Sequence, residues 1–365
     1  MNKNVTLRSP PGDLAAAFER GALMTWTASR LSSLRIAERY LESPYEHHVK
    51  YTERILGCAS ELSFRLRYVH REKITYDPDA EDVSDTVEFH SGYYVEGNLE
   101  NAFLCRCRNC AVCIKARVRK HRARLFQAFE LMFQAYPDYK WIFLTLTTKQ
   151  PALTDTRSHL EVMNKAWDRL QRCKEFPGVG FVKSFEFTGP KQEGGGKWQS
   201  GPMYVHPHFH CLVMVSPSYF GGKSYISQER WRQLWQRSLK ADYLPVVNVK
   251  KVTANPKKGV TRVQAAVLET VKYSVKPTTL AEAPPIWLAE ITQQLHKTRS
   301  LTVGGLVREF VSQAELDRID SELTSDDELK QEGEFVTFSW DGQAYRSGQV
   351  VNFGSVKMDC SEFVW

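Results

Sequence analysis

Three histidines on alternate residues, His206, His208 and His210, run directly into the apolar segment Cys211–Val215. Alternate side chains of a β-strand share one face, so this spacing predicts three imidazole rings on one side of a strand. The apolar segment that follows indicates that the strand is buried. Such a strand can present two or three nitrogen ligands to one divalent metal. The alternative is a chance cluster of core histidines.

A carboxylate for the same site lies on the preceding predicted strand, residues 180–188, whose even-numbered residues include Glu186. If the two strands pair, Glu186 stands beside His208 and His210. Two imidazoles and a carboxylate with open positions suit Mg²⁺ or Mn²⁺ holding a phosphate. We call these three residues the histidine–glutamate site. A surface glutamate is the alternative, and the long Gly-rich connection between the strands leaves both interpretations open.

Four cysteines fall within nine residues, Cys105, Cys107, Cys110 and Cys113, and they form two overlapping CxxC pairs. This spacing places two thiolates on one tetrahedral ion. We expect Cys110 and Cys113 to form a structural zinc knuckle. Cys105 and the distant Cys58 complete the ligand set, with Cys107 as the substitute. Reduced buried thiols and a redox pair are the alternatives.

Basic residues follow the cysteines directly, and a second basic stretch begins at residue 250. The candidates for DNA contact are Lys115, Arg117, Arg119, Lys120, Arg122, Arg124, Lys250 and Lys251. Dense positive charge beside a zinc knuckle suits phosphate contacts, although a solvated helix face or an exposed turn is the commoner meaning of such a run. The net charge of +7 permits nucleic-acid binding without proving it.

Residues 263–277 have the periodicity of a helix that ends at Pro277. Glu269, Tyr273 and Lys276 follow one another at i, i+4 and i+7, so they share the face opposite to the apolar one. A phenol has a pKa of about 10. It therefore needs a nearby cation or a polarised phosphate to act as a nucleophile near neutral pH. The alternative is a set of ordinary surface pairs.

The remaining pattern predicts a soluble, cytoplasmic protein of mixed secondary structure. The beginning of the chain has no apolar segment of the signal-peptide type, and no segment approaches a membrane span. We interpret the acidic residues 76–100 as a loop or exposed insertion, and residues 286–323 as helical with a break at Gly304-Gly305. Elsewhere we expect strands at 141–148 and 246–250 and helices at 156–172 and 225–239.

The order of three motifs resembles a known family. Phe143–Thr147, then His208-Phe209-His210, then Glu269 with Tyr273, is similar to the replication initiators of small rolling-circle plasmids. These are HUH endonucleases, here of the single-tyrosine type, and the cysteine knuckle resembles their N-terminal portion. The resemblance implies an α+β fold with a ferredoxin-like core, in which helices flank a central antiparallel sheet. We expect an N-terminal zinc-binding region at 1–125, the endonuclease at 126–285 and a C-terminal extension at 286–365.

The resemblance also implies an activity, which is metal-dependent nicking and strand transfer at the plasmid origin. Tyr273 would attack phosphorus, leaving a 5′-phosphotyrosine and a free 3′-OH that primes a host polymerase. Mn²⁺ or Mg²⁺ would occupy the histidine–glutamate site, and Zn²⁺ the cysteines. Glu269 would activate the terminating water, and Lys276 would orient the phosphate or lower the phenol pKa. The implied partners are single-stranded or hairpin-extruded origin DNA and a host helicase, with no membrane.

Other functions share part of this pattern. A relaxase or a single-tyrosine transposase of the same superfamily uses the same chemistry, but the cysteine knuckle and Glu269 favour replication. A metallo-hydrolase of small phosphates also accounts for the histidines. A zinc-knuckle nucleic-acid-binding protein without catalysis accounts for the cysteines and the basic residues.

Overall fold

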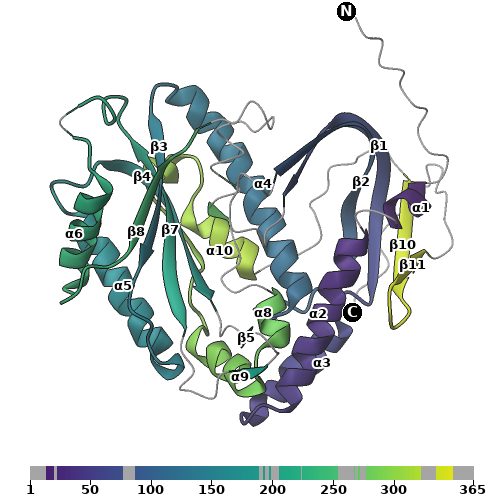
Figure 1. Ribbon diagram of the computed structural model, residues 1–365. Coiled ribbons are helices and arrows are strands. Elements are labelled where there is room, and N and C mark those ends of the chain that lie inside the picture. Colours follow the sequence, from purple (N-terminus) through teal and green to yellow (C-terminus); the bar gives the residue numbers. More distant parts are fainter. Residues whose placement is uncertain are drawn as a thin grey trace, which may run out of the picture.

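The computed structural model describes residues 14–19, 23–76, 87–188, 192–193, 197–198, 205–222, 224–253, 267, 270–271, 277–321 and 334–347. Two antiparallel sheets stand at opposite sides of the molecule, and the long helix α4 (Ala111–Ala135) runs between them (Figure 1). Within these ranges, no helix combines the length and the apolar character needed to cross a membrane.

The larger sheet has a ferredoxin-like core. Its strand order is β8-β3-β7-β4-β9, and each neighbouring pair is antiparallel. The strands are β3 (Lys140–Thr147), β4 (Gly178–Thr188), β7 (His206–Val215), β8 (Val247–Lys251) and β9 (Leu301–Gly305). Helix α5 (Thr156–Gln171) connects β3 to β4, and α6 (Gln228–Leu239) connects β7 to β8. This βαββαβ order is that of a ferredoxin-like unit, so the predicted α+β fold class is confirmed.

Apolar side chains on both faces hold this sheet between helices. On one face, Trp167 of α5 and Trp235 of α6 belong to the same buried cluster as Phe209 of β7. On the other face, Phe129 of α4 clusters with Leu212 of β7. The two clusters separate because alternate strand residues point to opposite faces. The even-numbered residues of β7, which include the histidines of the histidine–glutamate site, therefore share the face covered by α4.

The smaller sheet has the order β11-β10-β1-β2. Its strands are β1 (Glu61–Tyr76), β2 (Val87–Ala102), β10 (Glu334–Trp340) and β11 (Tyr345–Ser347). Residues 87–100 are thus a strand, and our interpretation of 76–100 as a loop was wrong for them. Low apolar content indicates exposure to solvent and does not exclude a strand. This strand is formed by backbone pairing with β1, and the pairing extends as far as Tyr76 and Val87.

The shorter elements complete the two layers. Near the smaller sheet lie α1 (Leu14–Phe18), α2 (Met24–Leu41), η2 (Glu46–His48) and α3 (Val49–Gly57). Helices η5 (Leu306–Glu309) and α10 (Gln313–Ser321) pack against β9 of the larger sheet. Helix α8 (Pro277–Glu282) packs against α2, and α9 (Pro285–Gln294) packs against both α2 and η3 (Leu153–Asp155). A two-stranded sheet, β5 (Gln192–Glu193) with β6 (Lys197–Trp198), lies in the connection between β4 and β7.

Residues 301–305 form strand β9, so the prediction of a helical segment at 286–323 with a break at Gly304-Gly305 was wrong there. Gly304 does more than break a helix, because a Cβ at this position would collide with the ring of Phe181 on the adjacent strand β4. Gly305 has a φ of +58°, a conformation that favours glycine. The two glycines therefore permit close pairing at the edge of the sheet.

The expected domain boundaries remain a prediction, but three elements bear on them. Helix α4 runs without a break across the expected boundary between residues 125 and 126. From the expected C-terminal extension, β9 joins the larger sheet and β10 joins the smaller one. The C-terminal residues thus contribute to both layers.

Candidate functional site

The histidine–glutamate site is assembled by strand register. Glu186 of β4 is the direct cross-strand partner of His208 of β7. The carboxylate oxygen Oε2 of Glu186 lies 2.8 Å from Nε2 of His210 and 3.3 Å from Nε2 of His208. One ligand atom from each of the three residues lies within 4.8 Å of the others. The structure therefore brings together the three residues that the sequence singled out for a divalent metal.

Neighbouring groups orient the two rings. Thr145 of β3 places its Oγ1 3.4 Å from Nδ1 of His210, and the ring of Phe143 stacks on His210 with centroids 5.4 Å apart. Nδ1 of His208 lies 3.3 Å from the backbone carbonyl of His206. Both rings thus turn Nε2 towards the carboxylate. The side chain of His206 is not part of this close group.

The donor set fits a divalent cation. Burial opposes ionisation of Glu186, but hydrogen bonds from His208 and His210 outweigh it, so the pKa of this carboxyl is lowered. A negatively charged oxygen beside two imidazole nitrogens suits a divalent ion that accepts mixed N and O ligands. The side chains are 16%, 13% and 8% exposed for Glu186, His208 and His210. Three protein ligands leave coordination positions open for the oxygens of a substrate.

A second cluster consists of four buried thiols, which we call the cysteine cluster: Cys58, Cys105, Cys110 and Cys113. Cys58 follows α3, Cys105 and Cys110 lie before α4, and Cys113 lies in the first turn of α4. Sγ of Cys58 lies 3.6 Å from those of Cys110 and Cys113, and Cys105 lies 3.6 Å from Cys113. Sulfurs bound to tetrahedral zinc at about 2.3 Å stand roughly 3.8 Å apart, so the spacing fits zinc.

Cys107 is buried but is not a member of this cluster. Its carbonyl instead accepts a hydrogen bond from the backbone N–H of Cys110 at 3.3 Å, which closes the turn that leads into α4. Hydrogen bonds from neighbouring thiols, that of Cys107 first among them, lower the pKa of Cys105. Of the two ligand sets that the sequence left open, the geometry favours the one with Cys58 and without Cys107.

The residues predicted for nucleophilic chemistry, Glu269, Tyr273 and Lys276, lie outside the described residues. Their described neighbours, Thr270 and Val271, are buried on the face of the sheet that carries the histidine–glutamate site.

Two side chains bind this neighbouring backbone. Ser184 of β4 donates its hydroxyl to the carbonyl of Thr270 at 2.8 Å. Ser184 is the cross-strand partner of His210 and stands two residues before Glu186 on the same face. Arg122 of α4 donates from Nη2 to the carbonyl of Val271 at 3.1 Å. The sequence gave no signal for Ser184, because the contact joins segments 86 residues apart.

Several predicted DNA contacts of α4 are engaged inside the protein. Arg117 donates from Nη2 to the carbonyl of Arg106 at 2.6 Å. Arg124 forms an ion pair with Glu315 of α10 at 2.9 Å. Lys115 donates to Thr25, and burial lowers its pKa to about 7. These groups are therefore less available to phosphates than a solvated helix face would suggest.

The other predicted contacts are more accessible. Arg119 is exposed near the ring of Trp26, and Lys120 is half-buried. Lys250 and Lys251 are exposed on the edge strand β8. Lys250 pairs with Phe143 and thus lies on the same face as His210. This lysine is the predicted basic residue best placed beside the histidine–glutamate site.

Comparison with known proteins places the chain in a family. The model of the family described as Replication protein, Rep_1, matches residues 96–347. The chain is 28% identical over 318 residues to Protein rep of Streptococcus pneumoniae serotype 2, covering 85% of this chain and 86% of that protein. It is 31% identical over 245 residues to Protein rep of Lentilactobacillus hilgardii, covering 64% and 74%.

A third relative is a Replication protein of Staphylococcus aureus, which is 30% identical over 241 residues and covers 62% of this chain and 98% of its own length. No solved structure matches the chain significantly. The matched region includes the cysteine cluster from Cys105 onwards, the whole histidine–glutamate site and the segment with Tyr273. The chain therefore belongs to the replication protein family and is a plasmid replication initiator.

Proposed function

We propose that this initiator nicks one strand of its plasmid origin and becomes joined to the new 5′ end through Tyr273. The observation that carries the proposal is the convergence of Glu186, His208 and His210 within hydrogen-bonding distance on a partly exposed face. Mn²⁺ or Mg²⁺ at this site would bind the scissile phosphate and neutralise the charge that develops on it.

The protein residues divide the covalent step between them. The phenol oxygen of Tyr273 attacks phosphorus, and a Tyr–O–P bond replaces the P–O3′ bond. The phenol loses its proton, and the leaving 3′ oxygen gains one to become a free hydroxyl. Lys276 would favour the ionised phenol and orient the phosphate. The anchoring of Thr270 by Ser184 supports this role for Tyr273, because it holds a residue three positions away on the face of the site.

Glu269 would act later in the cycle. Its carboxylate would accept a proton from the terminating water, whose oxygen attacks the phosphorus joined to Tyr273. The Tyr–O–P bond breaks, the phenol regains its proton, and the protein is released. The free 3′-OH from the first step would meanwhile serve a host polymerase, with a host helicase opening the duplex. Lys250 and Lys251, exposed on β8, would contact the backbone of the single-stranded or hairpin-extruded origin.

We further propose that Zn²⁺ occupies the cysteine cluster as a structural ion. The support is the 3.6 Å separation of the sulfur atoms and their complete burial at the start of α4. Four ligands of one type without an open position are typical of a structural zinc site. The ion would join the end of α3 to the start of α4.

The experiment is a search for the covalent intermediate. The protein is incubated with end-labelled single-stranded origin DNA and Mn²⁺, and adducts are separated on a denaturing gel. We expect an adduct with the wild-type protein and none with Tyr273→Phe, because phenylalanine lacks the attacking oxygen. Tyr225→Phe is the matched control, since this phenol is exposed on another segment. An adduct with Tyr273→Phe would refute the nucleophile. Origin binding without nicking by the wild type would favour a non-catalytic protein.

A further inference from the structure

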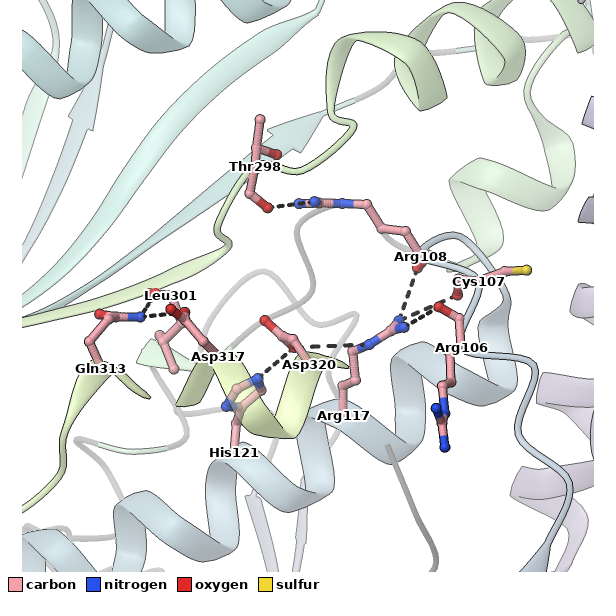
Figure 2. Close-up of polar contacts among 10 residues, drawn as sticks. All are labelled: Arg106, Cys107, Arg108, Arg117, His121, Thr298, Leu301, Gln313, Asp317 and Asp320. Atoms are coloured by element: carbon pink, nitrogen blue, oxygen red, sulfur yellow. Dashed lines mark hydrogen bonds and ion pairs between the residues drawn. The ribbon is translucent and has the colours of Figure 1, made fainter. Parts of the chain in front are cut away.

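A cavity of about 520 Å³ lies between the cysteine-rich loop, the end of α9 and helix α10. Its wall includes Arg106 and Arg108 from the loop, Arg117 from α4, and Lys297 and Arg299 after α9. Figure 2 shows the polar contacts of this region, with α4 below and α10 beside it. The cavity falls within the size range of small-ligand sites, and no residue of the histidine–glutamate site lines it.

The wall carries a surplus of positive charge. Five guanidinium or ammonium groups face two carboxylates, those of Asp317 and Asp320. Both carboxylates are already bound within the protein. Asp317 pairs with Arg299 at 2.8 Å, and Asp320 lies 2.9 Å from Nε2 of His121. The remaining positive groups therefore favour an anionic ligand.

Arg108 is a half-buried guanidinium in this wall. Its Nη1 donates to the carbonyls of Leu295 and Thr298 at 2.9 and 2.6 Å. Among the described residues no carboxylate pairs with it, and burial lowers its pKa to about 10. A buried guanidinium is costly unless an anion compensates it. An anion in the cavity would supply that compensation.

The loop that carries these arginines is held in place before any ligand binds. Arg117 reaches from α4 to the carbonyls of Arg106, Cys107 and Arg108 (Figure 2). Arg106 and Lys297, both exposed at the rim, have positive φ angles of 59° and 55°. Such angles are uncommon for residues other than glycine, and they concentrate at functional sites.

The cavity also adjoins the proposed nicking site. Its wall includes Ser184 and Val271. Ser184 stands two residues before Glu186 on β4, about 7 Å along a strand. Val271 is two residues before Tyr273 in the chain. A DNA strand whose scissile phosphate lies at the histidine–glutamate site would reach the cavity with a neighbouring nucleotide.

We propose that this cavity binds a phosphate-bearing nucleotide of the single strand, next to the scissile linkage, with Arg108 and Lys297 as the groups that contact its phosphate. The proposal rests on the proposed function for its substrate, but it assigns a separate binding role.

Binding can be tested without chemistry. The probe is a fluorescein-labelled single-stranded oligonucleotide of the plasmid origin, measured by anisotropy without added divalent metal. Loss of a charge-assisted contact in Arg108→Met should raise Kd about tenfold. It should also reduce the slope of log Kd against log salt by about 0.7. Lys297→Ala, an exposed substitution that spares the core, should act in the same direction. Lys165→Ala on exposed α5 is the control.

A neutral linkage identifies the phosphate. Methylphosphonate placed at one position near the nick should weaken wild-type binding as much as Arg108→Met does, and it should have no further effect on that variant. The proposal would be overturned if the effects of methylphosphonate and Arg108→Met added at every position tested. It would also be overturned if Arg108→Met and Lys297→Ala both bound the strand with wild-type affinity. Free deoxynucleoside triphosphate that stabilises the wild type but not Arg108→Met, with strand binding unchanged, would assign the cavity to a free nucleotide instead. An adduct with Tyr273→Phe would refute Tyr273 as the nucleophile, but it would not affect the result that Arg108 contacts a phosphate of the strand.

Discussion

Replacement of one thiol of the cysteine cluster tests the zinc proposal. In Cys113→Ser, a hard oxygen replaces a sulfur whose neighbours lie 3.6 Å away in a fully buried site. If free zinc exceeds the wild-type Kd by a hundred- to a thousandfold, the bound ion stabilises the fold by about 3 to 4 kcal/mol. Because 1 kcal/mol shifts Tm by about 2 to 4 °C in a domain of 150–250 residues, we expect Tm to fall on the order of 10 °C.

The matched control is Cys107→Ser. Cys107 is also buried and lies in the same loop, but its thiol is outside the cluster. We expect this variant to keep one zinc per chain and to lose only about 1 kcal/mol. Zinc content is measured by plasma mass spectrometry, and Tm by circular dichroism, on proteins purified side by side.

X-ray absorption at the zinc edge adds a direct measurement, with four sulfur neighbours at about 2.3 Å expected in the wild type. The reasoning is refuted if the purified wild-type protein contains no zinc. It is also refuted if Cys107→Ser loses zinc to the same extent as Cys113→Ser.

Four further substitutions test the proposed catalytic face and the core. His210→Ala should abolish nicking while Tm and zinc content stay near wild type, and wild-type nicking by this variant would exclude the metal assignment. Glu186→Ala should raise the Mn²⁺ concentration needed for nicking more than it raises the Kd for DNA. Glu269→Ala should still nick but accumulate the adduct on denaturing gels, whereas loss of the first nick would move Glu269 to the first step. Burial lowers the pKa of Lys183 from 10.5 to about 8, so the unfolded chain binds more protons between these values and wild-type stability should rise with pH across that window. Lys183→Met should remove this rise and stabilise the protein by about 3 kcal/mol at pH 7. The measurement is the free energy of unfolding in urea at pH 7 and at pH 10, and an equal change between the two pH values in both proteins would contradict the prediction.

The sequence was most informative where a short period determines which face a side chain occupies. The period of two placed His208 and His210 on one face of a strand, and the structure has them there. The start of helix α6 is an equally local feature. Ser227 begins α6 by accepting a hydrogen bond from the backbone N–H of Arg230 at 3.2 Å. These features depend on residues a few positions apart, so propensity and spacing suffice to predict them.

Strand register was harder to predict, because it depends on segments that are distant in the chain. The pairing of Glu186 with His208 spans the whole connection between β4 and β7, and a shift of one residue would have turned the carboxylate to the opposite face. Periodicity alone therefore left Glu186 as one of two interpretations. The pairing of β9 with β4 was missed for the same reason. In the sequence Gly304 indicates a break in a helix, and only the pairing with Phe181 shows that the glycine makes room for an aromatic ring.

The basic residues of α4 show a different limit. Their spacing predicts a helix face, but it cannot indicate whether that face meets solvent, DNA or protein. Arg124 forms a hydrogen bond with Glu315, and His121 forms one with Asp320, over sequence separations of 191 and 199 residues. These carboxylates belong to α10, for which the sequence suggested no partner. The internal role of α4 thus became visible only with the tertiary contacts.

Helix α4 links the cysteine cluster physically to the proposed nicking site. The helix begins at Ala111, directly after Cys110, and Arg122 within it donates to the carbonyl of Val271. Arg122 is twelve positions after Cys110, a distance of about 18 Å along the helix. Because an α-helix transmits displacement along its axis with little bending, the position of the cysteine cluster determines the position of the guanidinium that holds the backbone two residues before Tyr273. A structural ion at one end of α4 would therefore stabilise the geometry of the proposed nucleophile at a site that it does not touch.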